Sequence, residues 1–383
     1  MAERPLAGLK VLELARVLAG PWIGQTLADL GADVIKVEAP GGDETRAWGP
    51  PFAADGAAAY FHACNRGKRS LALDFRDPAD LGLARRLAAQ ADVLLENFKV
   101  GDLARYGLDH ASVAAGNPGI VYASVTGFGQ DGPLAARPGY DFIIQGMGGI
   151  MDLTGEPDGP PQKPGVAYAD LFTGLYGAVG VLAALALRAR TGRGQWLDLG
   201  LFDVQLAVLA NQAASHLIGG GSPHRMGNAH PAIVPYQLFQ AADGPMIIAC
   251  GNDGQFARLC EALALDLHRD LRYATNPGRV AHRAEVASAI AERLAAMARA
   301  EAIALLSAAG VPAGPINSVA EAFAEPQAEA RGAVQDLGGS RSPRSPLRFS
   351  DASSAADRPP PRLDEHGPAI RAALAAGVGW PGA

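Results

Sequence analysis

Asp170 is the residue whose surroundings most suggest covalent chemistry. It is a lone carboxylate among small and apolar residues in segment 165–174, at the start of a stretch with helical periodicity. Asp is a preferred cap at a helix N-terminus, and the local sequence alone favours that structural role. The same position would keep the carboxylate ionised, which a nucleophile requires. Asp170 is therefore a candidate nucleophile with a helix cap as its second interpretation.

Three loops elsewhere carry groups suited to an anionic ligand with an aromatic ring. Residues 15–21 precede a predicted helix, whose N-terminus could hold a phosphate. Residues 97–101 offer an amide, an aromatic ring and a cation, and residues 137–141 add Arg137 and Tyr140. Each loop alone could be an ordinary polar connection. Convergence of all three on one sheet edge would make a binding site.

Strands that alternate with helices must position these loops. The sequence predicts strands at 9–14, 32–37, 92–95, 120–125 and 195–200. Between and after them, it predicts helices at 22–30, 78–91, 110–115, 170–188 and 201–219. Mostly apolar strands in this order are typical of a parallel sheet covered on both faces. We therefore expect an α/β fold with ligands bound at the carboxyl ends of the strands, where the three loops lie.

A change in sequence pattern after residue 219 indicates a smaller α+β domain. Residues 237–249 predict a hairpin, and helices are expected over 254–264 and 281–309. We expect a large domain formed by residues 1–222 and 321–383, and a small domain formed by residues 223–320. The Ser-, Arg- and Pro-rich segment 339–361 predicts an extended or mobile tail.

Composition narrows the classes of partner. The net charge of −6 over 383 residues argues against nucleic acid or an anionic membrane as the main partner. The apolar stretch 175–187 is shorter than a membrane span and predicts a buried helix. The three cysteines and eight histidines form no metal-ligand pattern, and the N-terminus has no apolar run. We expect a cytoplasmic protein without bound metal or permanent cofactor.

Several motifs together resemble the class III CoA-transferase family, which includes formyl-CoA transferase. They include Gly42-Asp43-x-Thr45-Arg46, Asn65-Arg66-Gly67-Lys68-Arg69-Ser70, Glu96-Asn97-Phe98-Lys99-x-Gly101 and Pro138-Gly139-Tyr140-Asp141. No one motif is decisive, but their order and spacing from about residue 6 to 327 are specific. The resemblance implies a Rossmann-like large domain, a small inserted domain and an interlocked homodimer.

The resemblance also implies roles for single residues. It places the family's nucleophilic Asp at Asp170, and Tyr140 and Asp141 beside the approach to it. CoA contacts carry over to Val17, Leu18, Ala19, Leu73, Arg76, Asn97, Phe98, Lys99, Arg105 and Arg137. Coenzyme A is then a substrate, and the partners are an acyl-CoA and small carboxylic acids.

The implied reaction moves CoA between two acids through an aspartyl anhydride and an aspartyl-CoA thioester. An α-methylacyl-CoA racemase on the same fold is the alternative enzyme, and it would need an acid/base pair. Racemases carry a His where Tyr140 stands, and Tyr is a poor base near neutrality, so transfer is favoured. A non-catalytic CoA-binding protein is the third interpretation.

Three departures from the family pattern are present, and the last two bear on the substrate. Lys99 is followed by Val100, where the family often has Arg-Pro or Lys-Pro, so the charge is kept without a guanidinium fork. Formyl-CoA transferase has a Gln where this chain has Leu18, and its glycine-rich loop has no counterpart here. These differences weaken the case for oxalate and formate. Segments near 230–237, 251–256 and 276–283 resemble members that act on succinate, glutarate or mesaconate.

Overall fold

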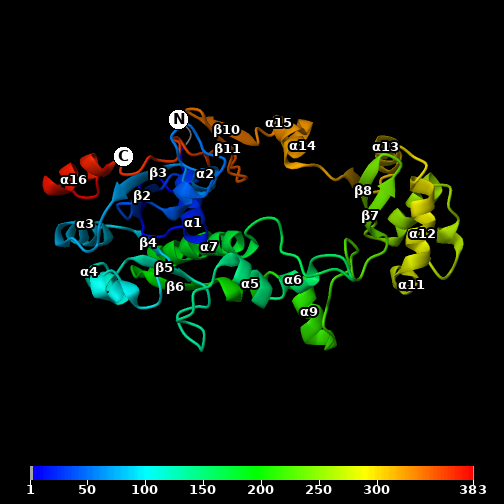
Figure 1. The fold of residues 1–383 in the computed structure, drawn as a ribbon, viewed down its shortest axis with the longest axis horizontal. Helices are drawn as coiled ribbons and strands as arrows, with labels where there is room; N and C mark the ends of the chain where they lie inside the picture. The colour runs from blue at the N-terminus through cyan, green and yellow to red at the C-terminus, as the bar shows by residue number, and fades with distance from the viewer. Residues whose placement is uncertain (1–2, 383) are drawn as a thin grey trace. The chain divides into compact units, whose positions relative to one another are not determined.

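The computed structural model describes residues 3–382, and a six-stranded sheet organises the first of its two compact units (Figure 1). The strands are β1 (Lys10–Glu13), β2 (Asp33–Glu38), β3 (Lys68–Ala72), β4 (Val93–Glu96), β5 (Val121–Thr126) and β6 (Gln195–Gly200). Their order is β3-β2-β1-β4-β5-β6, and each neighbouring pair is parallel. The expected α/β class with a parallel sheet is confirmed. The order reverses between β1 and β4, and open α/β sheets bind ligands outside the carboxyl ends of strands at such a point.

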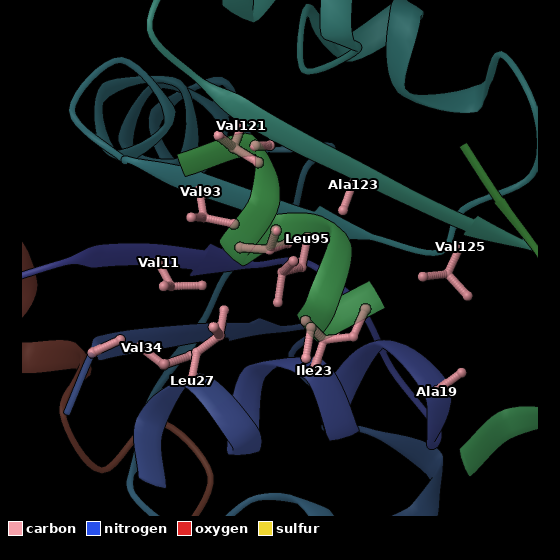
Figure 2. Packing of buried hydrophobic residues seen from close by; sticks show 14 of the residues in the cluster. Val11, Ala19, Ile23, Leu27, Val34, Val93, Leu95, Val121, Ala123 and Val125 are labelled. Carbon is pink, nitrogen blue, oxygen red and sulfur yellow. The ribbon is translucent and has the colours of Figure 1, made fainter. Parts of the chain in front are cut away.

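Apolar layers hold helices against both faces of the sheet. Side chains alternate between the faces along each strand, so Val11 belongs to one layer and Leu12 to the other. The first face is covered by α1 (Ala19–Asp29) and α7 (Tyr168–Thr191). The second face is covered by α3 (Pro78–Ala88), α4 (His110–Gly116) and α16 (Gly367–Ala375). Figure 2 shows Ile23 and Leu27 of α1 directed toward the strand residues of the first layer.

Shorter helices complete this unit, and the structure differs from the predictions at one helix and one strand. The shorter helices are η1 (Glu44–Ala47), α2 (Ala59–Cys64), η2 (Asp102–Tyr106), α5 (Asp141–Met147), α8 (Leu201–Ala207) and α9 (Ala210–Gly219). The single helix expected over 201–219 is the pair α8 and α9, which is interrupted where Ala210 takes a φ of +49°. Strand β3 was not among the expected strands, because Lys68, Arg69 and Ser70 give it a polar sequence.

The second unit, Met151–Gln162 with Ser222–Glu325, has its own apolar core. The predicted hairpin is present as β7 (Tyr236–Ala241) and β8 (Gly244–Ala249), and β9 (Ala313–Pro315) pairs antiparallel with β8. The helices are α10 (Asp253–Ala262), η3 (Leu267–Arg269), α11 (Asn276–Ala281), α12 (Arg283–Leu294), α13 (Arg299–Ala308) and α14 (Val319–Ala324), with α6 (Ile150–Leu153) at the junction of the units. The helix expected over 281–309 is therefore α12 and α13. The predicted domain boundaries stay a prediction.

The C-terminal segment returns to the first unit. After α15 (Pro326–Ala330), the strands β10 (Val334–Leu337) and β11 (Ser340–Pro343) form a small antiparallel hairpin. Further along, the indole of Trp380 donates to Asp33 Oδ2 at 2.8 Å, beside β2. Figure 1 shows α16, in red, near the blue strands of the N-terminal half. Within the tail expected to be extended or mobile, Ser340–Pro343 forms one strand of this hairpin. Later residues contact the sheet unit, where the N–H of Gly67 donates to the carbonyl of Arg358 at 3.1 Å and Arg4 Nη2 donates to the carbonyl of Ala355 at 3.1 Å.

Helix α7 is longer and less buried than the sequence predicts. It has 24 residues, and by length and composition it is apolar enough to cross a membrane, a test that core helices of soluble proteins also pass. Its buried side consists of small residues that pack against α1, α5, α8 and the sheet. On its other side, Leu175 is 47% and Val179 is 64% exposed. The prediction of a buried helix holds for one side of α7 only, because its other side is apolar and uncovered.

Candidate active site

A cavity of about 180 Å³ lies at the carboxyl ends of the central strands. Its lining comes from residues 16–19 after β1, residues 97–100 after β4, and residues 125–127 and 135–140 at the end of β5 and beyond it. Asp170 joins them from the first turn of α7. The structure thus brings nine candidate residues to one cavity, namely Val17, Leu18, Ala19, Asn97, Phe98, Lys99, Arg137, Tyr140 and Asp170.

Asp170 is the third residue of α7, and its carboxylate does not cap the helix. The cap comes from α5, where Asp141 Oδ1 accepts hydrogen bonds from the N–H of Ala169 at 2.9 Å and of Asp170 at 3.3 Å. Gln145 Nε2 donates to Asp141 Oδ2 at 2.7 Å and holds that carboxylate in place. The interpretation of Asp170 as a cap is wrong, because an acid distant in the sequence occupies that position.

The expectation that the helix N-terminus keeps the Asp170 carboxylate ionised is wrong, because burial and a neighbouring acid favour its protonated form. Its side chain is partly buried, and burial followed by repulsion from Asp141 raises the pKa of Asp170 to about 7. Burial has this effect because the charged carboxylate loses water. At neutral pH a substantial fraction is then ionised, and that fraction has no ion pair with any described residue. A carboxylate without a competing cation can attack an acyl carbon.

Asn97 ties the loop after β4 to the loop after β1. Its Oδ1 accepts from the N–H of Arg16 at 3.0 Å, and its Nδ2 donates to the carbonyl of Arg16 at 2.7 Å. The Arg16 guanidinium pairs with Glu44 at 2.9 Å, and both side chains line the cavity. The predicted binding amide therefore works within the protein as a clamp between two loops.

Lys99, Arg137 and Tyr140 form the exposed side of the cavity. Arg137 lies over the ring of Phe128, 5.7 Å from its centroid, and Tyr140 is 59% exposed. The two cations and the aromatic ring are accessible to a ligand that enters from solvent. Such groups suit a phosphate or a carboxylate near an apolar body.

A second cavity of about 380 Å³ shares Arg16, Glu44 and Phe98 with the first. It is lined by the two remaining candidates that follow β3, Leu73 and Arg76. Leu73 is buried, whereas Arg76 is exposed and pairs with Asp74 at 2.7 Å. An elongated ligand could therefore follow a continuous lining from the carboxyl end of β3 to Asp170.

Arg105 and Asp141, both within the described residues, lie outside the linings of these two cavities. Arg105 lies on η2 with its guanidinium over the Tyr106 ring, at 4.7 Å, and pairs weakly with Asp102 at 4.0 Å. Tyr106 itself lines the second cavity, so Arg105 is one residue from it. The contact role implied for Arg105 and the pocket role implied for Asp141 stay predictions, and the observed role of Asp141 is to cap α7.

Asp43 and Glu44 lie beside the site but were not among the predicted site residues. Glu44 lines both cavities, and Asp43 accepts hydrogen bonds from Thr45 N at 3.0 Å and Thr45 Oγ1 at 2.7 Å. An Asp two residues before a Thr is typical of a cap at the start of a short helix, and Asp43 caps η1. That spacing was the available signal. Among the described residues, no group of three His, Cys, Asp or Glu side chains could hold a metal ion.

Comparison with known proteins gives a consistent result. A family model described as CoA-transferase family III matches residues 6–367. A succinate–glutarate CoA-transferase from Agrobacterium fabrum is 53% identical over 97% of this chain and 96% of its own length. A succinyl-CoA:glutarate CoA-transferase from Mus musculus is 42% identical over 95% of this chain and 85% of its own length. The crystal structure of a CAIB/BAIF family protein from Brucella suis is 58% identical, with a TM-score of 0.89 over 98% of this chain and all of that one.

Proposed function

The chain belongs to CoA-transferase family III, and on that premise we propose that Asp170 is its nucleophile. We propose that the enzyme moves CoA from succinyl-CoA to a dicarboxylate. The observation that carries this proposal is the position of Asp170. Its carboxylate lines a cavity to which three loops contribute, while Asp141 takes over the capping of α7. A carboxylate that lines a ligand cavity and does not cap its own helix is suited to covalent catalysis.

The proposed reaction begins with acylation of Asp170. A carboxylate oxygen attacks the thioester carbonyl carbon, the C–S bond breaks, and CoA thiolate leaves a succinyl-aspartyl anhydride. The thiolate then attacks the aspartyl carbonyl carbon, which releases succinate and forms an aspartyl-CoA thioester. The acceptor carboxylate expels CoA thiolate from that thioester and forms a second anhydride. Attack of the thiolate on the acceptor's acyl carbon gives the new acyl-CoA and restores Asp170, with no net proton change.

The choice of substrates rests on the relatives and on the charge of the cavity. Proteins 53% and 42% identical to this chain are named for succinate or succinyl-CoA with glutarate. Both of these acids carry a second carboxylate, which needs a cation once the first is at the nucleophile. Arg137 and Lys99 line the same cavity as Asp170 and are accessible to a ligand in that cavity. Either cation could pair with a distal carboxylate or with a phosphate of CoA.

A CoA-exchange assay tests the function. Succinyl-CoA is incubated with each acid of a panel of mono- and dicarboxylic acids, and the acyl-CoA products are detected by mass spectrometry. We expect glutarate to give glutaryl-CoA and succinate. Asp170→Asn should abolish exchange while CoA still binds in calorimetry, because the cavity lining is otherwise intact. Asp131→Asn, at an exposed position outside both cavity linings, is the matched control and should exchange normally. Turnover by Asp170→Asn would refute the proposed nucleophile.

We also propose a homodimer that covers the uncovered side of α7. Leu175 and Val179 on α7 continue into Phe142 and Ile143 on α5, which are 58% and 42% exposed. Helices α5 and α7 pack against each other, and both carry exposed apolar side chains. A surface of this kind on a soluble protein marks an interaction site. The cytoplasmic location is a proposal as well, and the three buried free thiols agree with a reducing compartment.

A further inference from the structure

Val17 has a backbone conformation that its side chain disfavours. Its φ is +71°, in the left-handed region where a β-branched residue is an outlier. Such a conformation persists only where neighbouring groups fix it. Val17 is followed by Leu18 and Ala19, and all three line the cavity that contains Asp170. The shape of this wall of the cavity therefore depends on whatever holds the loop.

Two buried lysines hold the main chain at the two ends of this loop. Lys36 Nζ donates to the carbonyl of Ala15 at 2.8 Å, and Lys68 Nζ donates to the carbonyl of Pro21 at 2.8 Å. Glu13 lies between the lysines, with Oε1 3.2 Å from Lys36 Nζ and 2.9 Å from Lys68 Nζ. One carboxylate thus joins the cations that fix both ends of segment 15–21.

Asp43 holds the strained residue itself. Its Oδ2 accepts a hydrogen bond from the N–H of Val17 at 3.3 Å and pairs with Lys36 Nζ at 2.9 Å. The Thr45 N–H and hydroxyl fix Asp43 Oδ1 from the other side. A chain of contacts therefore runs from the strained main-chain N–H through Asp43 and Lys36 to the rest of the cluster.

The cluster of Glu13, Lys36, Asp43 and Lys68 is buried and balanced in charge. Glu13, Lys36 and Lys68 are fully buried and Asp43 is 4% exposed, with two cations facing two anions. Helix α1 accommodates it with Gly24, because a Cβ there would lie 1.8 Å from Glu13 Oε2. A glycine inside a helix lowers helix stability. Gly24 therefore makes room for the cluster at a cost to the stability of α1.

We propose that Glu13, Lys36, Asp43 and Lys68 are positioning residues that hold the Val17 loop in the shape that receives acyl-CoA. This inference rests on the proposed use of that loop for CoA. Replacing a buried ion cluster with apolar residues is often neutral or stabilising, so stability alone explains such a cluster poorly. Here three members of the cluster donate to or accept from the main chain of one loop, at Ala15, Val17 and Pro21. That common target indicates a role in shaping the cavity wall.

The test is a double-mutant cycle between Asp43→Asn and Val17→Gly. Asparagine keeps the size of the side chain and a carbonyl for Thr45, but it loses the charge that holds Lys36 and Val17. Glycine adopts a φ of +71° without strain. We expect Asp43→Asn to raise the KM for succinyl-CoA about tenfold, which is about 1.4 kcal/mol, while kcat changes less than about threefold. In the Val17→Gly background, the same substitution should raise KM less than about threefold.

Three results would overturn the proposal. They are an unchanged KM in Asp43→Asn, a loss confined to kcat, and an equal KM effect in both backgrounds, which would mean that Asp43 does not act through Val17. Asp131→Asn is the control for the loss of one carboxylate and should match wild type. If Asp43→Asn does not fold by circular dichroism, Lys36→Gln weakens the hold on the same carboxylate and has the same expectation and the same refutation. Wild-type exchange separates the two ideas, because an inactive wild type contradicts the proposed function and an active one with an uncoupled cycle contradicts only this inference.

Discussion

Replacing the proposed nucleophile should make the protein more stable at alkaline pH. The pKa of Asp170 is raised to about 7 from an ordinary value of 3.8, so the folded chain binds this proton more tightly than the unfolded chain. The free energy of unfolding therefore decreases as pH rises from about 4 to 7, and the loss persists above that range. The difference between a pKa of 3.8 and one of about 7 corresponds to about 4 kcal/mol. Partial solvent contact reduces this cost, so we expect about 2–4 kcal/mol.

Asp170→Asn removes the charge and keeps the shape, so it should recover that free energy. Urea unfolding followed by circular dichroism at about pH 8.5 should give a higher midpoint for Asp170→Asn than for wild type. The difference should shrink to less than about 1 kcal/mol near pH 4, because the acid is then protonated in the folded state and, with its ordinary pKa of 3.8, about half protonated in the unfolded state. Asp131→Asn, at an exposed position, should follow wild type at both pH values. A variant no more stable than wild type at alkaline pH, or a gain of equal size at both pH values, would refute the burial argument for Asp170.

Three further predictions follow from the same structure. The rate of Asp170 acylation by succinyl-CoA, measured by rapid quench, should increase with pH to a plateau above about pH 7. The reason is that the raised pKa leaves a smaller fraction of Asp170 ionised below pH 7. A rate that falls with rising pH would contradict this. Burial also raises the pKa of Glu96 to about 7 from an ordinary value of 4.5. Glu96→Gln should therefore raise the melting temperature much more at about pH 8.5 than near pH 4.5, and a lower melting temperature at pH 8.5 would argue against it. Val179→Asp places a charge on the uncovered side of α7 and should give monomers in light scattering, whereas an unaltered dimer would place the interface elsewhere.

The sheet and the loops at its edge could be predicted because they depend on local patterns. Apolar runs indicated five of the six strands of the large sheet, and helical periodicity with glycine stops indicated the helices between them. The sixth, β3, contains Lys68, Arg69 and Ser70, all buried. Their burial depends on partners far away in the sequence, such as Glu13 for Lys68 and Asp33 for Arg69. A pattern of polarity along one segment contains no information about those partners.

The role of Asp170 illustrates the same limit at the site. Its local sequence favours a cap, and only the contact from Asp141 to the start of α7 shows that the cap is supplied from elsewhere. The clamp between Asn97 and Arg16 is likewise a long-range pair, so sequence reasoning identified Asn97 but not what it contacts. Residue types and loop positions were sufficient to find the cavity lining. Hydrogen-bond partners and pKa shifts required the fold.

Chemical capture of the intermediate tests directly whether Asp170 is the nucleophile. Wild-type protein is incubated with succinyl-CoA and then hydroxylamine, digested, and analysed by mass spectrometry. We expect an aspartyl hydroxamate at Asp170, absent without succinyl-CoA and absent from Asp170→Asn. An unmodified Asp170 in a protein that exchanges CoA under the same conditions, or a hydroxamate on another acid, would show that Asp170 is not the nucleophile.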